Sequence, residues 1–494
     1  MSALILAVLL AALDQTIVST ALPRTAEDLN GFDDIAWVSA AYLLASTAGT
    51  PLWGKLGDMF GRKRLYLAST SVFLIASVAC GLAQNLPELI AARALQGVGG
   101  GGMIVLTFAL VGELVPAGER GRYQGMFGSV YGVASIVGPL LGGIFTDQLS
   151  WRWAFLINVP IGAVALAVAA RALPAGARGA KARIDYPGSL ILAAIATGIV
   201  LVTSFGERWG WASPAILGLI LATVVLAVAL VPVERRAAAP VLPVTMLASR
   251  TVVFSSLIGF VANAAMFSVL VYLPTYLQIV DGVSATLSGV HLLPLVVGLV
   301  VSQSLAGRWA ARPERLRLIL VSGLLINFAG LLLLGTIGAA TGTVVLSVYF
   351  LITGVGMGMV PMVVLTTVQN SVPAADLGAA SAVVTFARSI GAAFGVAVFG
   401  TLLSTGFAHG TRALPAGSGF DPSRPDTIGR LPGALRDTAL DAFAHATSTG
   451  FLWIAPTLAV GTVLALALRR PVSTTVQAAG NTPAEDAGDR AAVS

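Results

Sequence analysis

Fourteen long apolar runs, separated by short polar or charged segments, make up most of this 494-residue chain. Each run approaches the ~20 residues that a helix needs to cross the hydrocarbon core of a bilayer. Hydrophobic residues make up 56% of the chain and charged residues only 11%, which excludes a soluble protein. We therefore predict an all-α integral membrane protein with 14 transmembrane helices. The runs lie near residues 3–22, 36–53, 65–83, 88–111, 122–145, 154–172, 188–206, 213–233, 252–276, 285–306, 317–337, 343–366, 379–404 and 450–468.

Lys and Arg residues gather in alternate loops. An even number of crossings puts both termini on one side, and 20 of the 29 Lys and Arg residues lie in the loops and tail of that side, against seven in the opposite loops. Loops rich in Lys and Arg stay in the cytoplasm. We therefore predict a multi-pass protein of the cell membrane with both termini cytoplasmic. The net charge of +6 follows from this topology and does not indicate a nucleic acid partner.

Two segments lie outside the apolar pattern. Residues 405–449, rich in Gly, Pro, Asp and Arg, form the only long loop, which we place outside the cell. This loop is either a lid or a tolerated insertion, and we favour the insertion. Residues 471–494 lack apolar periodicity and are predicted to be a disordered cytoplasmic tail.

Asp14 is the only carboxylate deep within an apolar run. An unpaired charge at this depth is costly, so the group must be protonated, paired or in contact with water. Arg93, in the fourth run, lies at a similar depth, since the two positions differ by roughly 6 Å when counted at ~1.5 Å per residue from the outer helix ends. We interpret the pair as a proton-coupling site, in which protonation of Asp14 weakens its hold on Arg93. The alternative is a static buried ion pair.

The segment between the second and third runs combines spaced glycines, one aspartate and a cluster of cations. Glycines allow a tight turn and close helix approach, and an aspartate can make charge-assisted hydrogen bonds with nearby helix ends. A bias of cations toward the cytoplasm explains the Lys and Arg residues, but neither the glycines nor the aspartate. The residues are Gly54, Gly57, Asp58, Gly61, Arg62, Lys63 and Arg64.

Motifs for cofactors and for catalysis are missing from the sequence. Gly97–Gly102 fits Gly-x-Gly-x-x-Gly, but it lies within an apolar span and follows no strand, which argues against a nucleotide site. The chain has neither a Gly-Lys-Ser/Thr phosphate loop nor a His-Glu-x-x-His zinc motif, and Cys80 is its only cysteine. We therefore expect no cofactor, no metal and no enzymatic activity, and we expect the energy to come from outside the chain or from an ion gradient.

The segment Gly54–Arg64 resembles the signature loop of the major facilitator superfamily, Gly-x-Leu-Ala-Asp-x-x-Gly-Arg-Lys. Further segments resemble motifs of the fourteen-span drug:proton antiporters of this superfamily, and they follow in the expected order. They are Leu13–Pro23 in the first run, Arg93, Gln96, Gly97 and Gly99 in the fourth, Gly138–Gly143 in the fifth and Trp151–Gly162 at the sixth. The resemblance covers residues 4–470.

This resemblance implies the major facilitator fold, with two six-helix bundles around a central cavity and two inserted helices. The bundles would comprise residues 1–173 and 237–470, with the inserted helices at 174–236. The signature loop would gate the conformational change. In the fifth run, Gly138, Pro139, Gly142 and Gly143 would form a hinge or a seal against uncoupled leak, for which close packing of small residues is the alternative.

Polar and aromatic residues in several runs are candidates for lining the substrate cavity. For the tyrosines among them, anchoring at the membrane interface or packing is the alternative. Arg388, in the thirteenth run, either meets an anionic ligand or extends along the protein to the cytoplasm, and we favour the second interpretation. The cavity candidates are Gln15, Gln96, Asn263, Tyr272, Tyr276 and Gln278.

The resemblance implies a proton-coupled antiporter that exports small hydrophobic or cationic compounds, such as drugs, antibiotics and dyes, by alternating access. Its partners would be the substrate, protons and membrane lipids, and we expect a monomer. One alternative is an exporter of a lipid or a dedicated metabolite. Another, from a different class, is a nontransporting membrane receptor or scaffold, against which the antiporter motifs argue.

Overall fold

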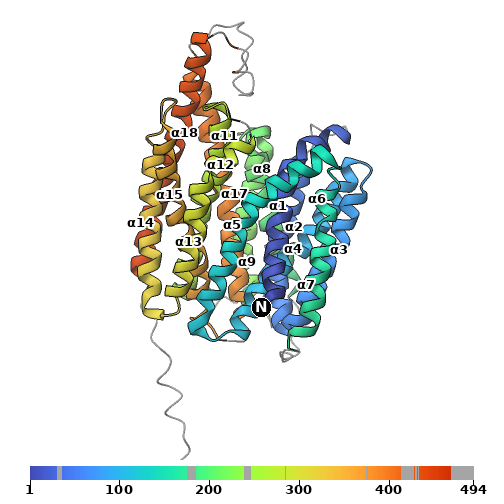
Figure 1. Cartoon of the computed structure of the whole chain (residues 1–494). Coiled ribbons are helices and arrows are strands. Elements are labelled where there is room, and N and C mark those ends of the chain that lie inside the picture. Colours follow the sequence, from blue (N-terminus) through green and yellow to red (C-terminus); the bar gives the residue numbers. More distant parts are fainter. Residues whose placement is uncertain are drawn as a thin grey trace, which may run out of the picture.

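The computed structural model consists of helices joined by short connections (Figure 1). It describes residues 1–29, 36–174, 185–237, 246, 248–283, 285–373, 376–412, 428, 431 and 433–468. The predicted cytoplasmic tail, 471–494, lies outside the described residues.

Each of the fourteen apolar runs falls on helix. Among the described residues, nine helical segments are long and apolar enough to cross a membrane. The chain is therefore an all-helical membrane protein, while the count of 14 crossings stays a prediction. The helices are α1 (Ser2–Asp28), α2 (Ala36–Phe60), α3 (Arg62–Leu82), α4 (Leu86–Leu114), α5 (Ala117–Gln148), α6 (Trp153–Leu156), α7 (Asn158–Ala172), α8 (Tyr186–Trp209), α9 (Pro214–Arg236), α11 (Arg250–Ile279), α12 (Ala285–His291), α13 (Leu293–Trp309), η2 (Pro313–Arg315), α14 (Leu316–Leu334), α15 (Thr343–Met359), α16 (Pro361–Gln369), α17 (Leu377–Gly410) and α18 (Gly433–Ala467).

Three of the runs predicted as single helices are interrupted, and a proline follows each interruption. The breaks between α6 and α7, α12 and α13, and α15 and α16 precede Pro160, Pro294 and Pro361. Proline has no backbone N–H and its ring crowds the carbonyl four residues earlier, so the helix is interrupted there.

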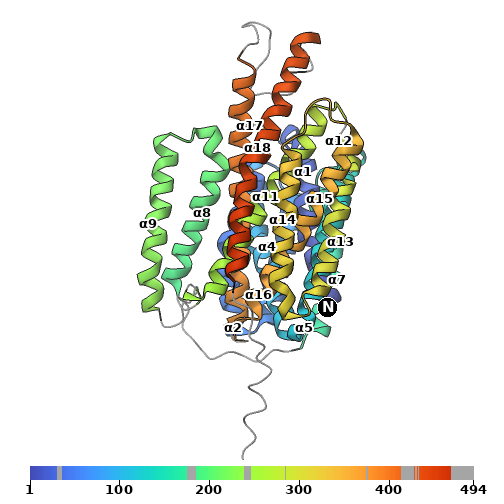
Figure 2. The ribbon, with the colours of Figure 1, turned by 90° about the vertical axis from the view of Figure 1, so that its left-hand side faces the viewer.

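The helices pack in two groups. Within α1–α7, helices α2 and α3 pack on α4, and α1 packs on α5; within α11–α18, α11 packs on α17 and α13 on α15. We call these groups the N-terminal half and the C-terminal half. They meet where α5 contacts α13 and where α2 contacts α17. Helix α8 packs on α2 and α17, and α9 lies outside α8, at the edge of the molecule (Figure 2).

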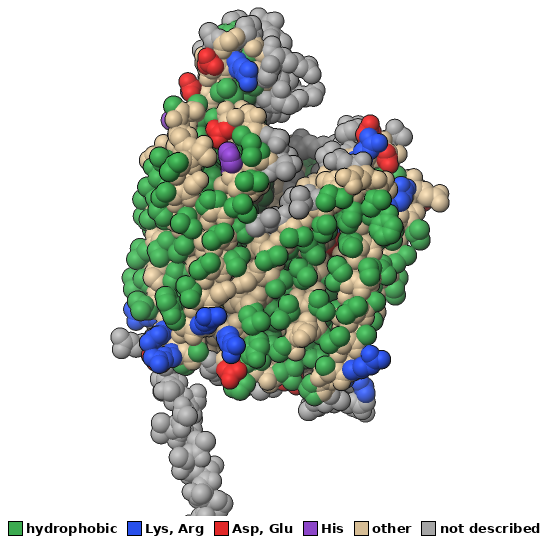
Figure 3. All heavy atoms as spheres, in the orientation of Figure 1, with side chains coloured by type: hydrophobic (Ala, Val, Ile, Leu, Met, Phe, Trp, Pro, Cys, Tyr) green, Lys and Arg blue, Asp and Glu red, His purple; other side chains and the backbone are tan. Residues whose placement is uncertain are grey.

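The surface carries the charge pattern of a membrane protein. Large hydrophobic side chains are exposed along the helices, including Leu221, Val228 and Val463 at 64%, 69% and 65%. Figure 3 shows hydrophobic side chains over most of the visible face and a row of Lys and Arg at its lower end. The N-terminus lies at the same end (Figure 1). We call this the N-terminal end of the molecule.

Helices α2, α3 and α4 approach so closely that glycine is required. A Cβ on Gly97 would overlap the carbonyl oxygen of Tyr42 in α2, and one on Gly99 would overlap the backbone nitrogen of Phe73 in α3. Small residues allow such contact between helix backbones in a membrane, where van der Waals packing drives association. The glycine-rich stretch that superficially fits a nucleotide motif is therefore a packing surface.

Helices α17 and α18 extend into the segment predicted as the long loop 405–449. Helix α17 continues to Gly410 and α18 begins at Gly433, so both ends of that segment are helical. The two helices project beyond the other helices at the end opposite the N-terminus (Figure 1). Phe407 and Phe443 pack edge to face at 5.3 Å, which holds the projecting helices together. Because polar residues interrupt the apolar pattern there, the sequence did not predict these helix extensions.

We predict that Gly97→Ala destabilises the protein and that Gly218→Ala does not. The added methyl at Gly97 would press against the Tyr42 carbonyl, at an expected cost of ~1–3 kcal/mol. At Gly218, in α9, a Cβ meets no atom within 4 Å. Thermal unfolding of both variants in detergent checks this, and equal midpoints for the two variants would contradict it.

Candidate functional site

Asp14 lies at the centre of a hydrogen-bonded cluster inside the N-terminal half. Its Oδ2 accepts a hydrogen bond from Arg93 of α4 at 2.8 Å, and its Oδ1 accepts from Gln96 of α4 and Asn158 of α7, each at 2.8 Å. Asp14 is 0% exposed and Arg93 is 2% exposed. The predicted pairing of Asp14 with Arg93 is present, and it joins α1, α4 and α7.

The polar neighbours of this ion pair also bond one another. Ser77 Oγ of α3 accepts from Gln96 at 2.6 Å and from Asn158 at 3.1 Å, and Gln96 Oε1 accepts from Arg93 at 2.7 Å. The Arg93 guanidinium lies 4.3 Å from the centroid of the Tyr42 ring. Both charges are thus compensated by direct bonds, as a low-dielectric interior requires.

This arrangement allows one chemical change with a large effect. A protonated Asp14 would lose its negative charge while the Arg93 guanidinium stayed positive, which removes the main compensation for a buried cation. The hydrogen bonds from Arg93, Gln96 and Asn158 to Asp14 would then weaken, so α4 and α7 would be held less firmly against α1. Loss of the carboxylate charge would remove the electrostatic link between α1 and α4.

Sequence reasoning missed three members of the cluster and misplaced one. Gln96, expected to line the substrate cavity, is instead 0% exposed and bonded within the cluster. Asn158 lies in the Trp151–Gly162 segment that carried part of the resemblance, which was a usable signal. Ser77 and Tyr42 stand in ordinary apolar runs, where no sequence signal separates them from packing residues.

The signature loop connects the two halves at the N-terminal end. Asp58 accepts hydrogen bonds from Arg62 at 2.7 Å and from the backbone N–H groups of Gly378 and Ala379, at 3.2 and 3.0 Å. These amides lie in the first turn of α17, where N–H groups have no partner within the helix and favour a negative charge. Asp58 of the N-terminal half therefore caps a helix of the C-terminal half.

Other members of the loop support this contact. Gly54 lies against α17, since a Cβ there would stand 2.8 Å from the Gly378 oxygen, and Gly61 has φ of +94° just before α3. Arg62 also pairs with Glu113 of α4 at 2.9 Å. Gly57 packs on Leu106, Lys63 donates to the Leu173 carbonyl, and Arg64 is exposed.

A second group of contacts closes the same end. Arg120 of α5 donates to the Gln369 carbonyl and to Asn370 Oδ1, both at 3.2 Å, and Gln369 Nε2 donates to the Phe108 carbonyl at 3.0 Å. Farther along, Ser129 and Ser304 are 2.7 Å apart. These contacts join the halves at the N-terminal end.

Glycines of the fifth-run motif bring α5 onto α1. A Cβ on Gly138 would overlap the Thr16 hydroxyl, and one on Gly142 would overlap that of Thr20. Thr16 also donates to the Ala134 carbonyl of α5 at 3.1 Å. Gly143 meets no neighbour within 4 Å, and Pro139 lies within α5. The motif thus packs on α1 at Thr16 and Thr20, two and six residues after Asp14.

The remaining cavity candidates lie in different surroundings. Gln15 is exposed and lies beside the Tyr42 hydroxyl. Tyr276 is 0% exposed and donates to the Gly338 carbonyl, so it packs the C-terminal half rather than lining a cavity. Tyr272 stacks on Phe399 and donates to the Val396 carbonyl. Asn263 is 3% exposed and donates to the Gly259 carbonyl, and Gln278 is exposed at the end of α11.

Arg388 does not extend to the cytoplasm as we expected. Its Cγ and Cδ lie over Gly259 of α11, at 3.0 and 3.7 Å from where a Cβ on that glycine would stand. Its Nε is shielded from solvent and makes no hydrogen bond. The side chain therefore stays inside the molecule.

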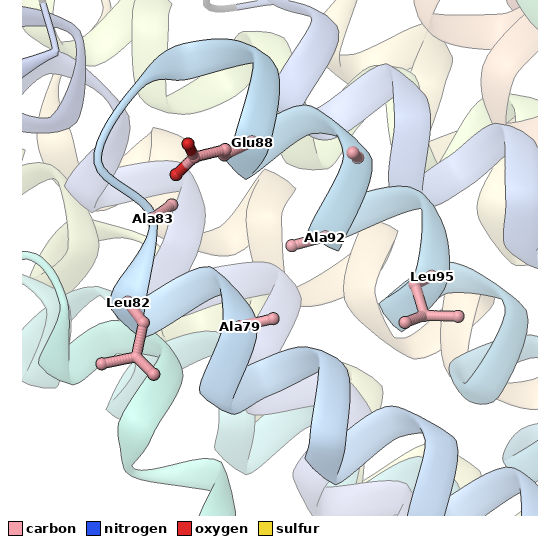
Figure 4. A pocket seen from close by; sticks show the side chains of 7 residues that line it. Ala79, Leu82, Ala83, Glu88, Ala92 and Leu95 are labelled. Atoms are coloured by element: carbon pink, nitrogen blue, oxygen red, sulfur yellow. The ribbon is translucent and has the colours of Figure 1, made fainter.

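A groove on the outer wall of the N-terminal half is unrelated to this site (Figure 4). Glu88 at its rim accepts from Asn85 Nδ2 at 2.7 Å and from the Gln84 N–H at 2.9 Å, as part of the start of α4. Leu82 and Leu95 are 66% and 46% exposed, so the groove faces away from the other half. Its lining is Ala79, Leu82, Ala83, Glu88, Ala91, Ala92 and Leu95.

Comparison with known proteins agrees with this fold. The sequence pattern of the Major Facilitator Superfamily matches residues 4–191 and 186–396. An uncharacterized MFS-type transporter of Mycobacterium tuberculosis is 39% identical over 99% of this chain and 71% of its own length. Multidrug resistance protein 3 of Bacillus subtilis is 35% identical, over 91% of this chain and 90% of its own length.

A solved structure supports the same fold. The human organic anion transporter MFSD10 matches with a TM-score of 0.64 at 14% identity, covering 94% of this chain and 98% of that chain. At this identity the likeness concerns the fold alone. The sequence match, which covers most of the chain, is to transporters rather than enzymes, and the protein belongs to the major facilitator superfamily.

Proposed function

We propose that this protein is a proton-coupled antiporter that exports small, largely apolar compounds from the cytoplasm by alternating access. The observation that carries the proposal is the buried cluster around Asp14, because a carboxylate at 0% exposure with three donors is a group whose charge state the packing depends on. The N-terminal end, with its Lys and Arg residues, is the cytoplasmic end.

In the proposed cycle, protonation of Asp14 is the step that changes the preferred opening. The ionised carboxylate holds Arg93, Gln96 and Asn158 together. The protonated carboxyl is neutral and no longer compensates the charge of Arg93. Because Arg93 then needs water or another acceptor, a different packing of α1 and α4 becomes more stable. A proton taken up from the outer side and released to the cytoplasm supplies about 2.3 kcal/mol per 100 mV, before any pH gradient is added.

The contacts at the N-terminal end form the gate of this cycle. Asp58 on the first turn of α17 and Arg120 on Gln369 join the halves in the state closed to the cytoplasm. Opening toward the cytoplasm must break these bonds, so they set the relative stability of the two states. Export also requires that they reform after the substrate has entered.

Two relatives support export of drug-like compounds. Multidrug resistance protein 3 of Bacillus subtilis spans nearly the same length as this chain, and the multidrug transporter protein MdtP of the same organism is 35% identical over 81% of this chain. An apolar cavity that binds by contact area accepts many lipophilic compounds. The proposal is therefore a broad substrate range rather than one metabolite.

Asp14→Asn should abolish uphill export while leaving a folded protein. Asparagine keeps the size of the side chain and can still accept from Gln96, but it carries no titratable proton. Transport of a fluorescent dye into inverted proteoliposomes, with and without an imposed pH gradient, measures the coupling. Glu27→Gln is the matched control, because Glu27 lies on the same helix and is exposed beside Arg24. Gradient-driven accumulation of the dye by the Asp14→Asn protein would rule out Asp14 as the proton-coupling group.

Asp58→Asn should slow transport by at least about tenfold while the purified protein still binds its dye. The substitution weakens charge-assisted hydrogen bonds worth ~1.5–3 kcal/mol each, and ~1.4 kcal/mol corresponds to a factor of ten. Arg64→Gln is the control in the same loop, because Arg64 is exposed and has no described hydrogen bond. Wild-type rates in the Asp58→Asn protein would show that this contact does not gate the cycle.

A further inference from the structure

Arg388 lies deep within the C-terminal half. It stands eleven residues after Leu377, the first residue of α17, which is roughly 17 Å along the helix axis. An arginine side chain cannot span that distance to reach water at the helix end. Its aliphatic part is held between α17 and Gly259 of α11, near Val364 of α16.

The guanidinium of Arg388 is uncompensated. Within the described residues it makes no ion pair and no hydrogen bond; its Nε is closed off from solvent, while the residue as a whole is partly exposed. The one described carboxylate deep inside the helices is Asp14, and that group is bonded to Arg93. Other described carboxylates, such as Asp58 and Glu113, lie near helix ends. The interior therefore holds two arginines and one carboxylate.

A cation among membrane-spanning helices without a partner is costly unless water or a negative charge compensates it. Arginine presents five N–H donors in a planar fork that matches a carboxylate or a similar oxyanion. Thr385, one turn earlier on α17, has a buried hydroxyl without a partner. The terminal guanidinium nitrogens of Arg388, which are not among the shielded atoms, are the donors open to a ligand.

The N-terminal half also reaches this position. Helix α17, which carries Arg388, packs on α2 and α4 of the N-terminal half. Arg388 thus lies on a helix that borders both halves, and a transported compound passes between the halves in alternating access.

We propose that Arg388 binds an anionic group, a carboxylate or a sulfonate, on the compound that this protein exports. This inference rests on the proposed export function and narrows its substrate class to amphiphilic organic anions. The cationic compounds in our expectation from the sequence fit the interior less well, because they would add a second uncompensated positive charge to that of Arg388. Exporting an anion from a cell that is negative inside is also favoured by the membrane potential.

Binding of two dyes of opposite charge tests this assignment. Fluorescein and rhodamine 6G share a tricyclic ring system, but fluorescein carries a free carboxylate and rhodamine 6G is a cationic ester. Fluorescence anisotropy with the purified full-length protein should show at least tenfold tighter binding of fluorescein. Arg388→Gln should remove that preference and leave rhodamine 6G binding unchanged, while Arg388→Lys should retain part of it.

Two further variants separate recognition from folding. Arg308→Gln, at an exposed position near the end of α13, removes the same charge and should leave both dyes unaffected. Gly259→Ala keeps the guanidinium but presses on Arg388 Cγ, so it should weaken fluorescein binding only. Thermal unfolding of each variant confirms that it is folded.

Absence of fluorescein binding to the wild-type protein, or equal fluorescein affinity in the wild-type and Arg388→Gln proteins, would overturn the proposal. Because the measurement uses no proton gradient, its failure would leave proton-coupled export standing. Conversely, loss of gradient-driven transport in proteoliposomes with intact fluorescein preference would count against the coupling alone.

Discussion

The ion pair between Asp14 and Arg93 is the interaction on which the N-terminal half is built. Four helices send a polar group to it: Asp14 from α1, Ser77 from α3, Arg93 and Gln96 from α4, and Asn158 from α7. In a medium without water each of these groups must find its partner inside the protein. The cluster therefore fixes the helices relative to one another, and it does so through a charge that one proton can cancel.

At the N-terminal end, hydrogen bonds join the two halves to each other instead of joining helices within one half. There Asp58 bonds the first-turn amides of a helix in the other half, and Arg120 bonds the C-terminal end of α16, so the partners come from both halves. Bonds near water can be exchanged for bonds to water at small net cost. The buried cluster is thus suited to hold one half rigid, whereas the bonds at the end are suited to break and reform as the halves move.

Much of this was predictable, and the limits have physical causes. The length of each apolar run predicts a helix, because a backbone in lipid must form its hydrogen bonds within the protein and a helix does so within one segment. Pairing of Asp14 with Arg93 followed from depth along two helices. Orientation around a helix axis did not follow from the sequence, since the surroundings of Gln96 and Arg388 depend on which neighbouring helix each helix face meets. Apolar length also misses the extensions of α17 and α18, where the projecting helices pack on each other through Phe407 and Phe443.

Charge balance connects the proton-coupling cluster with the proposed binding position. With Asp14 ionised, the interior carries one uncompensated positive charge at Arg388, and protonation of Asp14 adds a second at Arg93. An anionic substrate bound between the halves would offset one of them. In an antiporter the proton and the substrate occupy the protein in turn, so the anion would compensate Arg388 while Asp14 is ionised and would leave before Asp14 is protonated.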